Sequence, residues 1–99
     1  MTNQGKGAVK ASIARKLTAA LAPMALEIID ESHLHAGPGH HRHPDGETHF
    51  RVETVSAAFS GKSRVERHRM VNDLLAEELA GRVHALAISA KTPEEAANM

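Results

Sequence analysis

The hydrophobic positions of this 99-residue chain change their period several times, and each period predicts one element. Near the N-terminus, apolar residues recur every four positions, at Val9, Ile13, Leu17 and Leu21. This is the spacing of an amphipathic helix. Pro23 follows, so we expect the helix to end before it.

Two short runs typical of β-strands come next. Residues 26–30 read Leu-Glu-Ile-Ile-Asp, and residues 50–55 alternate between apolar and polar side chains. The alternation predicts a strand with Phe50, Val52 and Thr54 on its buried face. The segment between the two strands is then a long hairpin connection, and loops of that length often carry function.

A second helix is predicted over residues 64–80. Ser63 and Glu66 form a capping-box pattern, in which each side chain bonds to the other residue's backbone N–H. Apolar residues follow at helical spacing and Gly81 is the expected stop. His68 lies on the apolar stripe of this helix, where we expect a packed, hydrogen-bonded histidine rather than a metal ligand.

Residues 83–89 are mostly apolar, which predicts a third strand buried on both sides. Thr92 and Glu95 form a second capping box with Pro93 at the first helical position, so a terminal helix begins there. The order α-β-β-α-β-α predicts an α+β fold in which helices pack on one face of a three-stranded sheet. We expect one domain over residues 8–95, with tails at residues 1–7 and 96–99.

Charge and composition narrow the classes of function. Twelve basic residues balance twelve acidic ones, which argues against binding nucleic acid by bulk charge. The chain has no cysteine, so it can supply neither a catalytic thiol nor a thiolate metal ligand. No window resembles a membrane span or a secretory signal, which leaves the cytoplasm as the expected compartment. No nucleophile elbow, paired-carboxylate signature or phosphate loop is present, so we expect no enzyme activity.

Histidine is the exception to this plain composition. Of the eight histidines, most fall in or beside the predicted loop, namely His33, His35, His40, His41, His43 and His49. Imidazole is the commonest metal ligand in proteins. Histidines two residues apart can chelate one Zn, Ni or Cu ion with little selectivity, so we expect adventitious metal capture at this loop.

Several stretches in order resemble the BolA family. They are Leu-Glu-Ile-Ile-Asp-Glu-Ser (26–32), Thr-His-Phe-Arg-Val (48–52), Val-Ser-Ala-Ala-Phe-Ser-Gly-Lys (55–62), Arg-His-Arg-Met-Val (67–71), His-Ala-Leu-Ala-Ile (84–88) and Ala-Lys-Thr-Pro (90–93). The resemblance covers roughly residues 9–95. It implies a BolA-like fold related to class II KH domains.

The resemblance also implies a function. BolA-like proteins pair with a monothiol glutaredoxin as a heterodimer around a bridging [2Fe–2S] cluster, shared with glutathione, in iron–sulfur cluster assembly, trafficking or iron-linked regulation. The family's two ligand positions map to His84 and, within the loop, to His35; His33 and His49 are lesser candidates. Residues 39–43 look like an insertion relative to the shorter family loop.

Two interpretations stay open beside this one. His49 is either a third ligand, a group that orients another histidine or a structural residue, and we favour the last two. Separately, Lys62, Arg64, Arg67 and Arg69 surround a predicted helix start, which suggests partner contacts or a DNA-binding regulator. Residues 61–64 lack the second glycine of the KH phosphate loop, which weakens the nucleic-acid interpretation.

Overall fold

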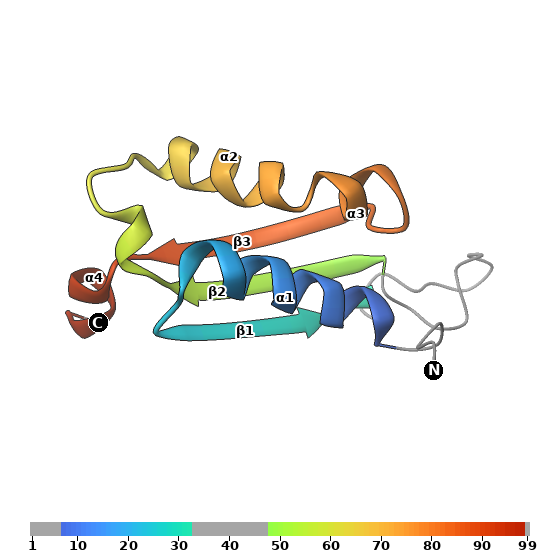
Figure 1. Ribbon diagram of the computed structural model, residues 1–99, viewed down its shortest axis with the longest axis horizontal. Helices are drawn as coiled ribbons and strands as arrows, with labels where there is room; N and C mark the ends of the chain where they lie inside the picture. The colour runs from blue at the N-terminus through green and yellow to red at the C-terminus, as the bar shows by residue number, and fades with distance from the viewer. Residues whose placement is uncertain (1–6, 33–47, 99) are drawn as a thin grey trace.

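The computed structural model describes residues 7–32 and 48–98. Figure 1 shows three strands side by side with helices against them. The elements are α1 (Ala8–Leu21), β1 (Ala25–Asp30), β2 (His49–Val55), the short 3₁₀ helix η2 (Ala57–Phe59), α2 (Arg64–Leu74), α3 (Ala76–Ala80), β3 (Ala85–Lys91) and α4 (Pro93–Ala97). The predicted α-β-β-α-β-α order is confirmed, and none of the helices in the described ranges is long and apolar enough to span a membrane.

The sheet has the order β1-β2-β3 and is mixed. β1 and β2 are antiparallel, with Ile28 opposite Val52, as a hairpin requires. β3 runs parallel to β2 and places Ile88 beside the same Val52. The predicted alternation on β2 is confirmed, because Phe50, Val52 and Thr54 are buried while Arg51 and Glu53 are exposed.

The hydrophobic core lies between this buried face of the sheet and the two longer helices. α1 packs on β1 and α2 packs on β3, as Figure 1 shows. The apolar stripe of α1 contributes Ile13, Leu17 and Leu21, and both phenylalanines of the chain are buried with them. The predicted packing of helices on one face is therefore confirmed.

The predicted helix over residues 64–80 is interrupted at Leu75. This residue has φ −106° and ψ 22°, so α2 ends before it and α3 begins after it. Leu75 is itself almost fully buried. Beyond the interruption, the Glu78 carboxylate accepts a hydrogen bond of 2.6 Å from the Ser12 hydroxyl of α1. The contact between α3 and α1 thus follows the interruption of the helix at Leu75, and the periodicity of the apolar residues does not reveal either feature.

The prediction that the third strand is buried on both sides is wrong. Ala85 is exposed and the other residues of β3 are only half-buried. Among residues 7–32 and 48–98, β3 is an edge strand, since β2 is its only neighbour in the order of the sheet. The prediction rested on the mostly apolar composition of residues 83–89, which is also typical of strands covered on both faces. The buried Val83 lies before the strand rather than in it.

Candidate metal centre

His84 lies immediately before β3, at the end of the sheet where the hairpin connection leaves β1. Its backbone N–H donates a hydrogen bond of 2.7 Å to the carbonyl oxygen of Thr48, the residue that precedes β2. His84 is nevertheless exposed. The backbone is therefore fixed to the sheet while the imidazole faces outward, where a ligand or a partner can reach it.

His49 is brought next to His84 by the parallel register of β2 and β3, which pairs His49 with Ala85. The two imidazole centroids lie 6.3 Å apart and the ring planes are inclined by 24°. The Nδ1 atom of His49 shares a 2.9 Å hydrogen bond with the Thr48 hydroxyl. This bond helps to fix the orientation of the ring. The ring of His49 thus lies beside that of His84, and the roles predicted for His49 stay predictions.

The hairpin connection begins and ends beside the two histidines. The Ser32 hydroxyl accepts hydrogen bonds from the backbone N–H of Thr48, at 2.9 Å, and of His49, at 3.3 Å. Ser32 is held in turn by the carboxylate of Asp30, which accepts from its backbone N–H at 2.9 Å. The segment that carries most of the histidines therefore leaves and re-enters the fold next to His84. Sequence reasoning did not single out Ser32 or Thr48, because their role depends on contacts between two strands.

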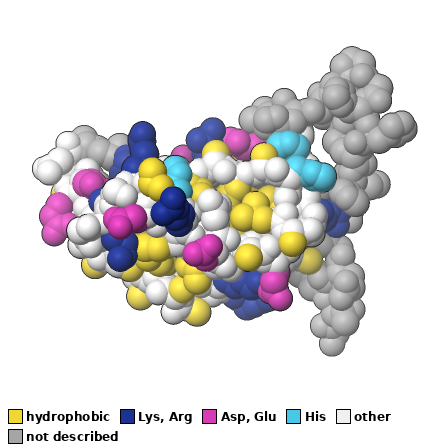
Figure 2. All heavy atoms as spheres, turned by 90° about the horizontal axis from the view of Figure 1, so that it is seen from above, with side chains coloured by type: hydrophobic (Ala, Val, Ile, Leu, Met, Phe, Trp, Pro, Cys, Tyr) yellow, Lys and Arg dark blue, Asp and Glu magenta, His cyan; other side chains and the backbone are white. Residues whose placement is uncertain are grey.

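The remaining loop histidines lie outside the described residues. They are His33, His35, His40, His41 and His43, and the ligand roles predicted for His35 and His33 stay predictions. Within residues 7–32 and 48–98, no three histidine or carboxylate side chains gather closely enough to hold a metal ion. Figure 2 shows histidine side chains exposed on one face of the molecule. The described part of the chain thus offers an imidazole pair beside the loop.

The predicted basic segment has two kinds of residue. Lys62, Arg64 and Arg69 are exposed around the start of α2. Arg67 instead bonds within the chain, because its guanidinium donates to the carbonyl oxygens of Lys62, at 2.9 Å, and Ala90, at 3.1 Å. It also donates to the Glu95 carboxylate at 2.6 Å. The partner-binding role predicted for Arg67 would have to compete with these contacts.

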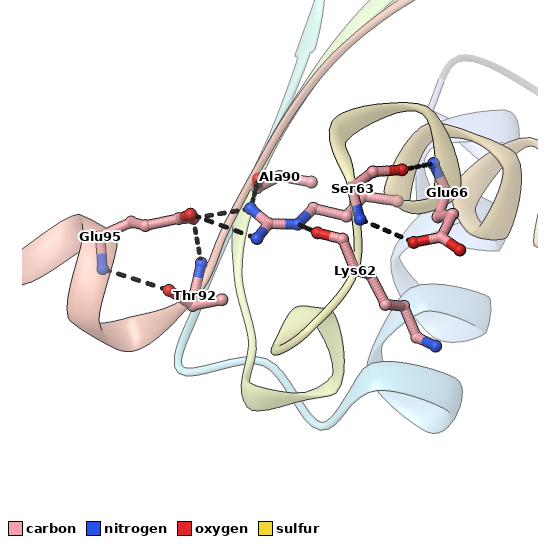
Figure 3. Close-up of polar contacts among 7 residues, drawn as sticks. Lys62, Ser63, Glu66, Ala90, Thr92 and Glu95 are labelled. Atoms are coloured by element: carbon pink, nitrogen blue, oxygen red, sulfur yellow. Dashed lines mark hydrogen bonds and ion pairs between the residues drawn. The ribbon is translucent and has the colours of Figure 1, made fainter.

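The ion pair between Arg67 and Glu95 links α2 to α4. Figure 3 shows the carboxylate of Glu95 pointing back toward Thr92, and also the first capping box, at Ser63 and Glu66. The hydrogen bond from Arg67, together with one from the Thr92 backbone, lowers the pKa of Glu95 to about 2. Both predicted capping boxes are confirmed, and the second one is tied to a cation on another helix.

His68 is half-buried on α2, as expected of a packed histidine. It lines a groove between α2 and β3, far along β3 from His84. The structure therefore does not bring it to the imidazole pair of His49 and His84.

Comparison with known proteins shows the family of the chain. The family model described as BolA-like protein matches residues 17–95. BolA-like protein 1 from Homo sapiens is 53% identical over 89 residues, which cover 90% of this chain and 61% of that protein. The chain thus spans less than two-thirds of the length of that relative.

Solved structures show the same fold. The BolA domain of SufE1 from Arabidopsis thaliana superposes with a TM-score of 0.80 at 49% identity, covering 90% of this chain and 96% of that one. BolA1 from Mus musculus gives a TM-score of 0.75 at 47% identity, covering 99% of this chain and 76% of that one. In sequence and in fold alike, the chain belongs to the BolA-like family.

Proposed function

We propose that this protein is a non-catalytic BolA-type adaptor. In this proposal it binds a monothiol glutaredoxin and co-ligates a bridging [2Fe–2S] cluster, in iron–sulfur cluster assembly, trafficking or iron-linked regulation. The observation that carries the proposal is the placement of His84. Its imidazole is exposed at the end of the sheet where Ser32 and Thr48 hold both ends of the histidine-rich segment.

The chain can supply the imidazole ligands of such a cluster but not its thiolate ligands. With no cysteine, the chain offers imidazole nitrogens, and histidines replace two thiolates on one iron in Rieske clusters. We assign His84 and His35 as this chain's ligands, with His49 orienting His84. The thiolates would come from the partner's cysteine and from glutathione. Ligands divided between two proteins make metal binding a source of association energy.

Visible circular dichroism tests the ligand assignment. Mixing the apo-protein with cluster-loaded glutaredoxin should change the spectrum of the cluster, because its ligands and their asymmetry change. We expect His84→Ala and His35→Ala to reduce this change strongly. His33→Ala and the matched loop control His43→Ala should leave it intact. An unchanged spectrum with the wild-type protein, or the same change with His84→Ala, would exclude His84 as a ligand.

A DNA-binding regulator is the second candidate function. The observation in its favour is the exposure of Lys62, Arg64 and Arg69 around the start of α2. Gel-shift titration at two salt concentrations tests it, since phosphate contacts make affinity fall as salt rises. Arg64→Ala should weaken specific binding several-fold. Equal affinity for unrelated duplexes, or no effect of Arg64→Ala, would rule this function out.

A further inference from the structure

The outer edge of β3 is a row of backbone groups that β2 does not use. The backbone N–H of Ala85 donates to Thr48, and the carbonyl oxygen of Lys91 accepts from Ser56, so these residues turn their backbone groups toward β2. Backbone groups alternate in direction along a strand. Those of Leu86, Ile88 and Ala90 therefore point to the opposite edge, away from β2.

A groove of about 380 Å³ lies along this edge. It is lined by Arg64, Arg67 and His68 of α2, by residues 88–91 of β3 and by Glu95 of α4. The Ala90 carbonyl is already occupied, because it accepts the hydrogen bond from Arg67. Proteins shield exposed strand edges with such charged side chains. Here the side chain of Arg67 occupies the carbonyl oxygen of Ala90, and Ile88 also lines the groove.

The groove carries a positive charge. Its lining contains Arg64 and Arg67 of α2 and the carboxylate of Glu95. Arg67 and Glu95 neutralise each other at 2.6 Å. Arg64 is exposed at the first position of α2, on the side of the groove that faces the strand edge. A ligand with an acidic group beside Arg64 would match this distribution of charge.

We propose that the groove binds an extended, acidic peptide segment of a partner protein. The peptide adds as a further strand on the edge of β3, with main-chain hydrogen bonds to Ile88 and a carboxylate beside Arg64. Strand addition of this kind gives affinity through the backbone and specificity through side chains. The site is independent of the cluster proposal, because it lies at the other end of β3 from His84.

The same observations disfavour a single-stranded nucleic acid in the groove. Single-strand binding relies on exposed aromatic side chains on which bases stack. The only aromatic residues of types Phe, Tyr or Trp are Phe50 and Phe59, and both are buried in the core. The Glu95 carboxylate would also lie close to any phosphate in the groove.

Nuclear magnetic resonance of the full chain tests the proposal. The probe is a blocked seven-residue peptide of alternating valine and threonine with one central glutamate. It should shift the amide signals of residues 86–90 and 64–68, with a dissociation constant on the order of 10–100 μM, as small interfaces give. The same peptide with all of its backbone nitrogens methylated should not bind, because it can donate no main-chain hydrogen bond to β3. Absence of shifts at Ile88, or equal binding of the methylated peptide, would overturn strand addition.

Charge reversal tests the role of Arg64. Arg64→Glu should lower the affinity for the acidic peptide roughly tenfold. The variant should instead bind a peptide with a central lysine more tightly than the acidic one. The fold should tolerate this variant, because an acidic residue is favourable in the first turn of a helix. Arg15→Glu, on the exposed side of α1, makes the same charge change and should leave peptide binding unaltered. If oligothymidine shifts the groove signals and the peptide does not, the groove is a nucleic-acid site and the proposal fails.

Discussion

Ala22 turns the chain from α1 toward β1 in a conformation that costs free energy. It has φ 44° and ψ 55°, the left-handed region, and its backbone N–H donates to Thr18 at the helix end. A β-carbon makes this region unfavourable by about 1–2 kcal/mol, whereas glycine occupies it readily. The position thus offers a direct test of the backbone geometry.

Ala22→Gly should raise the free energy of unfolding by about 0.5–1 kcal/mol, since relief of strain exceeds the extra entropy of the unfolded chain. Denaturant titration measures this change. The control is Ala19→Gly, an exposed position inside α1, which should lower stability by about 0.5–1 kcal/mol. If Ala22→Gly is as destabilising as Ala19→Gly, Ala22 is not left-handed in solution.

Glu95 makes stability depend on pH in the acid range. Its pKa is lowered from 4.5 to about 2 in the fold, chiefly by the hydrogen bond from Arg67. A lowered pKa in the folded state means that the ionised carboxylate stabilises the fold above the unfolded pKa. This contribution is therefore complete above about pH 5 and disappears as the pH falls toward about 2.

Glu95→Gln should be less stable than the wild type at neutral pH and should lose less stability on acidification. Glutamine keeps the capping bond to Thr92 but cannot form the ion pair with Arg67. Denaturant midpoints across the acid range give the comparison. Glu94→Gln, at the exposed neighbouring residue, should follow the wild-type curve. Parallel acid curves for Glu95→Gln and the wild type would contradict this prediction.

For single residues, the sequence indicated which side chains are candidates for function, but it did not predict which of them contact one another. His84 could be selected by its resemblance to a family ligand position. Its contact with His49 depends on the register of two parallel strands, and that register is set by packing rather than by any local pattern. The bond network of Arg67 was equally hidden, because its partners come from a turn, a strand and another helix.

Among the elements, α2 shows how a short polar pattern fixes a helix start. The Ser63 hydroxyl accepts from the backbone N–H of Glu66 at 3.1 Å, and the Glu66 carboxylate accepts from the backbone N–H of Ser63 at 2.7 Å. Both residues are exposed, so a substitution at Ser63 changes the capping bonds without removing a buried side chain.

Ser63→Ala should lower the free energy of unfolding by about 1 kcal/mol, the usual cost of removing a capping hydroxyl. Thermal or denaturant unfolding gives the value. Ser63→Asp provides the matched control, because aspartate is also a favoured N-cap residue and should restore most of the stability. Equal losses for alanine and aspartate would mean that the hydroxyl has another role.

The two element-level errors have a common physical origin. Helical periodicity continues through Leu75, and the apolar composition of residues 83–89 is typical of a buried strand, yet neither property reports what packs nearby. The helix changes direction where α3 meets α1, and β3 is half-buried because it lies at an edge. Capping boxes were predicted correctly because all of their partners lie within four residues.

For the whole molecule, the core is small and almost entirely aliphatic. Leu17 of α1 belongs to this core and has no exposed surface. Leu17→Ala should cost about 2–5 kcal/mol, because it removes buried methyl groups and leaves a cavity. That is a large part of the 5–15 kcal/mol typical of a domain.

Denaturant titration of Leu17→Ala measures this loss. The control is Val65→Ala, since Val65 is 57% exposed on α2 and should change stability by less than about 0.5 kcal/mol. Similar losses in both variants would mean that the core does not lie where the structure places it. The overall architecture itself was predictable, because each apolar face had to find a partner and few arrangements of three strands and two long helices provide one.

The parallel pairing of β2 with β3 has a consequence for the order of events during folding. The β1–β2 hairpin joins neighbouring segments, but β3 can pair only after η2, α2 and α3 have been placed between the two strands. Pairings that close long stretches of chain are slow to form. We therefore expect His49 and His84 to meet late, so that a nearly folded chain still lacks the imidazole pair. A partner that recognises this pair would select fully folded molecules from newly made ones.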